Sequence, residues 1–72
     1  MKQYSVYYES DQMICNSYDH FYGYTTSMRT AKAYISQIKK NYSDHNPRNF
    51  RIYDQYAEVE DDEPIPCIYR EG

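Results

Sequence analysis

A chain of 72 residues with a formal net charge of −3 has room for one small domain, which we expect to span residues 1–72. The negative charge argues against general binding of the phosphate backbone of nucleic acids by the whole molecule. Two cysteines do not make a disulfide framework, and no stretch resembles a signal peptide or a membrane span, so we expect a soluble, cytoplasmic protein.

The first predicted element is a strand from Gln3 to Glu9. Tyr4, Val6 and Tyr8 alternate with a second set of side chains, which is the period of two typical of a strand. Residues 10–12 contain turn-forming side chains, so we expect a turn to follow this strand.

The segment between this strand and the next element is less regular. Met13–Cys15 is a short apolar run that pairs back on the first strand in one interpretation. Residues 16–24 mix turn formers with four aromatic residues, which predicts a loop or an irregular sheet edge whose aromatic side chains lie on the sheet. Gly23 stands between two tyrosines and indicates a turn or a bulge.

The clearest pattern predicts a helix over about residues 27–42. Apolar residues recur there at steps of three and four, which gives the helix one apolar face made of Met28, Ala31, Ile35, Ile38 and Tyr42. Thr26 or Ser27 is the expected N-cap. Pro47 cannot continue a helix, so we expect the helix to end by residues 43–47.

A further strand is predicted from Asn49 to Tyr53. Its alternation places Phe50 and Ile52 on one face. Residues 54–55 interrupt the pattern, and residues 56–59 continue it with the phase shifted, as a β-bulge would do.

The chain then predicts an acidic turn at residues 60–64 and a last strand from Ile65 to Arg70. Pro66 cannot donate a ladder hydrogen bond, so this strand should lie at an edge of the sheet. The order is β-β-α-β-β, or β-α-β-β if residues 10–24 form a loop. Either order predicts an α+β fold, a two-layer sandwich of one helix on a sheet of three or four mainly antiparallel strands.

Tyrosine dominates the apolar composition, with 11 Tyr, 2 Phe and no Trp. A buried tyrosine needs a partner for its hydroxyl group, so many of these rings should lie half-buried. If the first and third strands are neighbours, Tyr7 and Tyr53 lie on the sheet face away from the helix, close to Arg48 and Arg51. Aromatic rings flanked by arginines resemble the stacking surfaces of single-strand binders, but a half-buried sheet face or a dimer interface fits them as well.

Two sets of charged residues, one acidic and one basic, are candidate binding surfaces. Residues 58–63 hold five of the eleven carboxylates, which would suit a basic groove on another protein or an acidic hairpin turn that discourages aggregation, but they lack the layout of a calcium loop. The candidate nucleic-acid surface is basic and consists of Arg29, Lys32, Lys39, Lys40, Arg48 and Arg51. The four on the helix are equally typical of a solvated helix face.

No catalytic or ligand-binding motif stands out. A zinc site would need Cys15, His20, His45 and Cys67, but two of these ligands are isolated and the sequence has no C-x-x-C pair. A Cys15–Cys67 disulfide would require the second and last strands to adjoin, in a compartment that we expect to be reducing. Nucleophile elbows, phosphate-binding loops and metalloprotease patterns are absent from the sequence. We therefore expect neither enzymatic activity nor a metal or other cofactor.

The order of strand YSVYY, helix TAKAYISQIKK, strand NFRIYD and strand IPCIYRE, in a chain of this size, resembles small phage and mobile-element proteins of the anti-CRISPR type. The resemblance is one of architecture. It implies a protein of the host-cell cytoplasm that inhibits a host defence system by blocking the surface of a partner.

We therefore expect a non-enzymatic module that binds a protein, namely a nucleic-acid-handling defence complex, with a homodimer as a further option. A membrane is not expected as a partner. The predicted contact residues are tyrosines and carboxylates: Tyr7, Tyr53, Tyr56, Glu58, Glu60, Asp61, Asp62 and Glu63. The alternative is a small accessory protein that binds nucleic acid through the basic helix face and stacking tyrosines.

Overall fold

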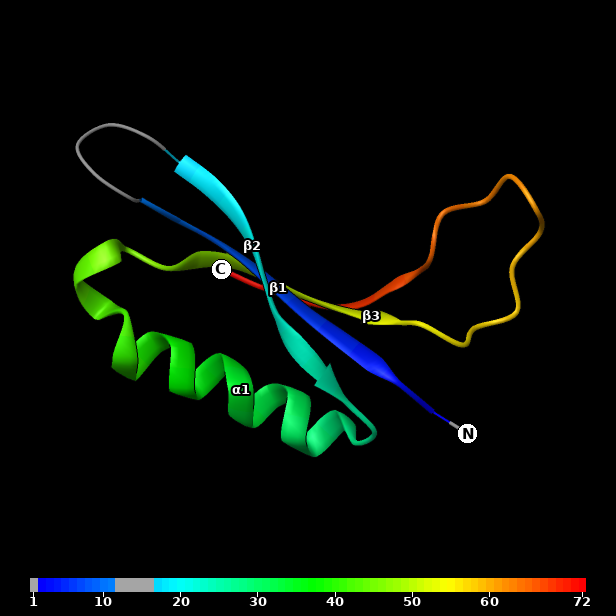
Figure 1. The fold of residues 1–72 in the computed structure, drawn as a ribbon, viewed down its shortest axis with the longest axis horizontal. Coiled ribbons are helices and arrows are strands. Elements are labelled where there is room, and N and C mark those ends of the chain that lie inside the picture. Colours follow the sequence, from blue (N-terminus) through cyan, green and yellow to red (C-terminus); the bar gives the residue numbers. More distant parts are fainter. Residues whose placement is uncertain (1, 12–16) are drawn as a thin grey trace.

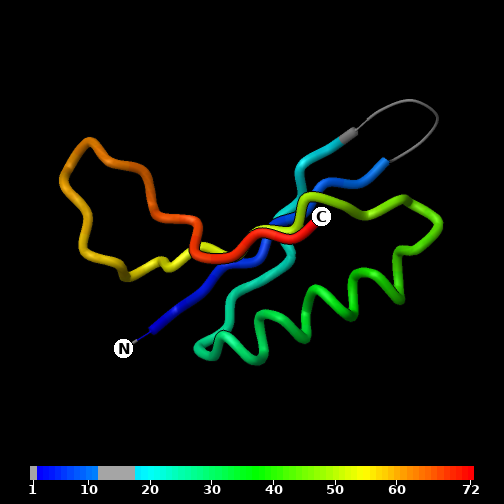
Figure 2. The backbone as a smooth tube through the Cα atoms, turned by 180° about the vertical axis from the view of Figure 1, so that it is seen from behind, coloured from blue at the N-terminus to red at the C-terminus, as the bar shows by residue number. Residues whose placement is uncertain are grey.

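The computed structural model describes residues 2–11 and 17–72. One helix packs on one face of a four-stranded antiparallel sheet with strand order β2-β1-β3-β4 (Figures 1 and 2). The elements in chain order are β1 (Tyr4–Asp11), β2 (Ser17–Thr25), α1 (Met28–Asn41), the single 3₁₀ turn η1 (Ser43–His45), β3 (Arg48–Asp54) and β4 (Cys67–Glu71). This confirms the predicted α+β fold in its β-β-α-β-β form.

Strand β1 lies in the middle of the sheet and pairs with both β2 and β3. Its alternation confirms the predicted strand, since Val6 and Tyr8 are buried in the core under the helix. The predicted turn at residues 10–12 is wrong for its first two residues. Ser10 and Asp11 instead extend β1 by pairing with Tyr18 and Ser17.

Strand β2 forms one edge of the sheet and contains a bulge, so of the two alternatives predicted for residues 16–24 the irregular sheet edge is confirmed and the loop is wrong for the part that the structure describes. The aromatic residues favour an extended backbone, and eight of the nine residues of β2 pair with β1. The pairing skips Tyr22, because Gly23 pairs with Val6 while Phe21 pairs with Tyr7. This bulge next to Gly23 confirms the interpretation of that glycine. The predicted strand Met13–Cys15 lies outside the described residues.

Helix α1 has the predicted bounds to within one residue at each end. Ser27 is the N-cap, and its hydroxyl group accepts a hydrogen bond from the backbone N–H of Thr30 at 3.4 Å. After η1, Asn46 adopts a left-handed conformation (φ 51°) before Pro47, which ends the helical stretch as expected.

Strand β3 ends at Asp54, so the predicted continuation through residues 56–59 is wrong. The carboxylate of Asp54 accepts a hydrogen bond from the N–H of Tyr56 at 3.2 Å, and this local bond turns the chain out of the sheet. The long loop of residues 55–66 extends beyond the sheet at one end of the molecule (Figure 1). Strand β4 begins at Cys67, two residues later than predicted, and lies at the other edge of the sheet as expected.

The core is small and lies between the sheet and α1. Its buried members come from three elements and are Val6, Tyr8, Ala31, Ile35, Ile38, Phe50 and Ile52. Half-buried tyrosines of the two edge strands and of the helix pack around them. Each aliphatic side chain in this cluster therefore accounts for a large share of the buried apolar surface.

The edge strand β4 is attached to the helix through Glu71. Its carboxylate forms an ion pair with Lys39 and accepts a hydrogen bond from the Tyr69 hydroxyl at 2.6 Å. The Lys39 ammonium and the Tyr69 hydroxyl together lower the pKa of Glu71 below its ordinary value. Lys32 adds a second contact, with its ammonium 4.9 Å from the centre of the Tyr69 ring.

Replacing Ile38 by valine should lower the free energy of unfolding by about 1 kcal/mol, because a methylene group is lost from a fully buried site. Ile68→Val is the matched control on an exposed strand position and should change it by less than about 0.5 kcal/mol. Urea unfolding followed by circular dichroism measures both values. Equal losses in the two variants would contradict the assigned core.

The folded protein should lose stability in acid through Glu71. Its pKa is lower in the folded than in the unfolded state, so its contribution is complete above the ordinary glutamate pKa of about 4.3 and disappears as the pH falls through the lower folded value. Glu71→Gln should therefore show a shallower loss of stability over this acid range than the parent chain. Urea unfolding at a series of pH values measures the slopes, with the exposed Glu58→Gln as the control. Parallel curves for the parent chain and Glu71→Gln would exclude this role.

Candidate functional site

The sheet face opposite the helix, here called the open face, carries a row of aromatic rings. Tyr7 and Tyr53 meet edge to face with ring centres 5.4 Å apart, and Phe21 lies 5.3 Å from Tyr7 on its other side. Tyr24 extends the row, with its ring centre 4.7 Å from that of Phe21. The row therefore crosses β3, β1 and β2, and the bulge in β2 is what brings Phe21 and Tyr24 to the same face.

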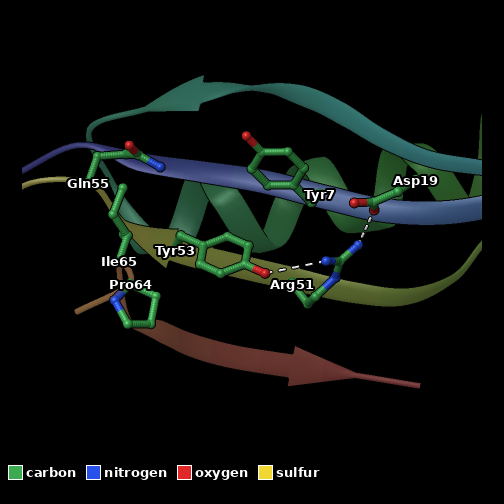
Figure 3. Close-up of a pocket in the computed structure, with 7 residues that line it drawn as sticks. All are labelled: Tyr7, Asp19, Arg51, Tyr53, Gln55, Pro64 and Ile65. Carbon is green, nitrogen blue, oxygen red and sulfur yellow. Dashed lines mark hydrogen bonds and ion pairs between the residues drawn. The ribbon is translucent and has the colours of Figure 1, made fainter. Parts of the chain in front are cut away.

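A hollow of about 270 Å³ lies at one end of this aromatic row and is open to solvent. Figure 3 shows its lining side chains on the open face, with the helix behind the sheet. They come from three strands and both ends of the β3–β4 loop: Tyr7, Asp19, Arg51, Tyr53, Gln55, Pro64 and Ile65. We call this hollow the open-face pocket.

Arg51 ties the wall of the open-face pocket together. Its guanidinium forms an ion pair with Asp19 and donates hydrogen bonds to the Tyr53 hydroxyl (3.3 Å) and the Asn49 carbonyl (3.2 Å). It also lies 5.9 Å from the centre of the Tyr7 ring. Burial opposes the charged form, but the hydrogen bonds that the guanidinium donates to Asp19 and Tyr53 outweigh it and raise the pKa of Arg51. The arginine thus serves as an internal tie whose charge is balanced by Asp19.

The β3–β4 loop is fixed where it leaves the sheet. The Gln55 backbone N–H donates to the Gln3 carbonyl at 2.8 Å, and the Gln55 side chain donates to the hydroxyl of the buried Ser5. At the other end of the loop, the Asp54 N–H donates to the Pro66 carbonyl at 3.2 Å. Both ends are therefore held beside the pocket, and Pro64 and Ile65 form part of its wall.

The predicted partner-binding residues fall into two neighbouring groups. Tyr7 and Tyr53 lie side by side in the open-face pocket, as expected if the first and third strands pair. The carboxylates Glu58, Glu60, Asp61, Asp62 and Glu63 are all exposed on the β3–β4 loop, which both leaves and re-enters the sheet at the pocket. Tyr56 is exposed at the start of this loop and is not among the lining residues. The structure thus combines a tyrosine-lined pocket with an acidic loop.

The residues of the alternative nucleic-acid surface do not form one patch. Arg29, Lys32, Lys39 and Lys40 belong to α1, whereas Arg51 lies on the open face across the sheet. Lys39 is paired with Glu71.

Arg48, the sixth residue of that alternative surface, forms an ion pair with Asp11 at 2.9 Å. The bond from Arg48 lowers the pKa of Asp11, with a smaller contribution from the Asn46 amide. Because α1 packs on the other face of the sheet, its lysines and the tyrosines of the open face lie on opposite sides of the sheet.

The cysteine and histidine residues are separated in the part of the chain that the structure covers. Cys67 is a free thiol whose Sγ donates to the Tyr69 carbonyl at 3.3 Å, and Cys15 lies outside the described residues. His20 stacks on Tyr8 with ring centres 5.1 Å apart, while His45 lies beside Asp44. Among residues 2–11 and 17–72, no cluster of three or more metal-ligating side chains occurs, and no helix is long and apolar enough to cross a membrane.

Sequence reasoning missed Asp19, Gln55, Pro64 and Ile65 as pocket residues. Alternation along β2 could have placed Asp19 on the same face as Phe21, had that segment been recognised as a strand. The two ends of a twelve-residue loop meet only in the folded chain, so the last three had no local signal. Comparisons of this chain with protein families, with curated proteins and with solved structures found no match.

Asp19→Asn should lower the free energy of unfolding by about 0.5–1 kcal/mol, because the largely buried guanidinium of Arg51 loses its ionised partner. The exposed Asp61→Asn removes the same charge from the loop and should change stability by less than about 0.5 kcal/mol. Urea unfolding near neutral pH compares the two variants. If Asp19→Asn is no more costly than Asp61→Asn, the Arg51 tie does not hold the pocket wall.

Proposed function

We propose that this protein is a non-enzymatic binding module whose open face occupies the surface of a protein partner. The observation that carries the proposal is the row of tyrosine and phenylalanine rings that ends in the open-face pocket. Tyrosine anchors in pockets are the side chains on which binding energy at protein interfaces is concentrated. The Arg51 tie holds the pocket in shape before binding, which reduces the ordering cost of association.

The charges around the pocket suggest the chemistry of the partner. Five exposed carboxylates lie on the loop beside it, and the cation that lines the pocket, Arg51, is already balanced by Asp19. A partner with a basic surface would therefore be attracted and oriented by this loop. Basic grooves of that kind are what nucleic-acid-handling proteins use to hold phosphates. We propose that the protein inhibits such a complex, of the host-defence type, by covering its basic surface.

Affinity capture from a lysate of the native host, with mass spectrometry, tests the role of the tyrosines. Tyr7→Ala and Tyr53→Ala should each weaken partner binding by about 30-fold or more, as loss of an aromatic anchor does. Tyr42→Ala removes the same side chain from the end of the helix and should leave binding unchanged. If Tyr7→Ala and Tyr53→Ala capture the same proteins as the parent chain, the open face is not the binding surface.

A second arm separates this proposal from direct nucleic-acid binding. Fluorescence anisotropy with single-stranded and duplex oligonucleotides at low salt should show no binding by the parent chain. Binding that Lys32→Glu or Lys40→Glu abolishes would support the basic helix face instead. Once a partner has been captured, added nucleic acid should compete with the protein for binding to that partner. Absence of competition would contradict the blocking of a basic groove.

A further inference from the structure

Strand β2 has an outer edge that is unusually open to pairing. It is a nine-residue edge strand, and its sequence SYDHFYGYT contains no lysine, arginine or proline. Those residues are the ordinary devices that stop one sheet edge from adding to another. Three large side chains of β2, Tyr18, Phe21 and Tyr24, are each about half exposed. The features that oppose pairing are the bulge at Tyr22 and the charge of Asp19, which is already paired with Arg51.

The opposite edge of the sheet is protected. Strand β4 has only five residues, two prolines precede it at positions 64 and 66, and it contains Arg70. The contrast between the two edges of one sheet is informative, because both would face the same risk of aggregation. An edge left open while the other is closed indicates that the open one is used for pairing.

We infer that β2 pairs antiparallel with β2 of a second copy of this chain, which gives a homodimer with a continuous eight-stranded sheet. The inference does not depend on the partner proposed above. Antiparallel pairing of two identical strands requires a twofold axis perpendicular to the sheet. This axis keeps both open faces on the same side, so the aromatic rows of the two copies meet through Phe21 and Tyr24.

The charge distribution favours a second copy as the occupant of this edge. Asp19 is the only carboxylate of β2, and it is already paired with Arg51 of its own chain. The acidic loop of residues 55–66 lies at the end of the sheet where β2 finishes, because Thr25 and Asp54 both pair with Tyr4. A perpendicular twofold axis sends the two loops to opposite ends of the dimer. The net charge of −3 on each chain therefore opposes association weakly.

The mass of the protein in solution tests the inference directly. Sedimentation velocity should give twice the 8.7 kDa of the chain at micromolar or higher concentration. Phe21→Lys should raise the dimer dissociation constant by about 100-fold, because it brings two like charges together near the middle of the paired strands. Ile68→Lys places the same charge on the exposed part of β4 and should leave the dimer intact. Far-ultraviolet circular dichroism checks that both variants are folded.

Two results would overturn the inference: a parent chain that remains a monomer up to about 1 mM, and a dimer that Phe21→Lys does not weaken. Hydrogen exchange of the unaltered chain decides the case if Phe21→Lys does not fold. Backbone amides of Ser17–Thr25 should exchange more slowly as the protein concentration rises, while those of Cys67–Glu71 should not change. Concentration-independent exchange in β2 would exclude pairing through this edge.

Discussion

The packing of one side of β1 against the helix is the interaction on which the rest of the structure depends. Val6 and Tyr8 lie in a single buried cluster with Ile35 and Ile38, and β1 lies between β2 and β3 in the sheet. A domain of this size has little apolar surface to bury beyond such a cluster. Every other element is therefore positioned relative to β1, directly or through one neighbouring strand.

A single helix covers only one face of a four-stranded sheet, and this constraint produces the open face. Side chains that alternate with the core residues must face solvent or a partner. The chain fills these positions with tyrosine and phenylalanine, whose rings pack on one another in Tyr7, Phe21 and Tyr53. The ion pair of Arg51 with Asp19 links β3 to β2 across β1 on the same face. The open face is thus both a second, smaller packing layer and the surface that we propose for binding.

The two edges of the sheet are unevenly protected because β4 and β2 differ in composition and in their contacts with the rest of the fold. Strand β4 begins only after Pro66, which has no N–H to donate to a ladder, and it is attached to the helix by the Lys39–Glu71 ion pair. Strand β2 carries aromatic residues along its whole length because it supplies rings to both faces, Tyr22 to the helix side and Phe21 to the open face. The same composition leaves few charged residues to shield its edge.

The sequence by itself determined the helix, an N-cap at Thr26 or Ser27, the alternation in β1 and β3, and the edge position of the last strand. These features depend on local spacing, on a capping hydroxyl group and on the missing N–H of proline, all of which are readable within a few residues. It also determined that Tyr7 and Tyr53 share a face once the two strands pair. The resemblance to host-defence inhibitors and the absence of an enzymatic activity stay predictions.

Only the tertiary structure decided the rest. Residues 17–24 became a strand because pairing with β1 outweighs the turn-forming tendency of Asp19, His20 and Gly23, and this competition cannot be read locally. The segment after Asp54 leaves the sheet where the Asp54 carboxylate accepts a hydrogen bond from the Tyr56 N–H. The open-face pocket joins side chains from positions 7 to 65, so its existence depends on strand order and register. The packing of Val6 and Tyr8 against the helix fixes which face of β1 is buried, and the side chains on its other face then line the pocket.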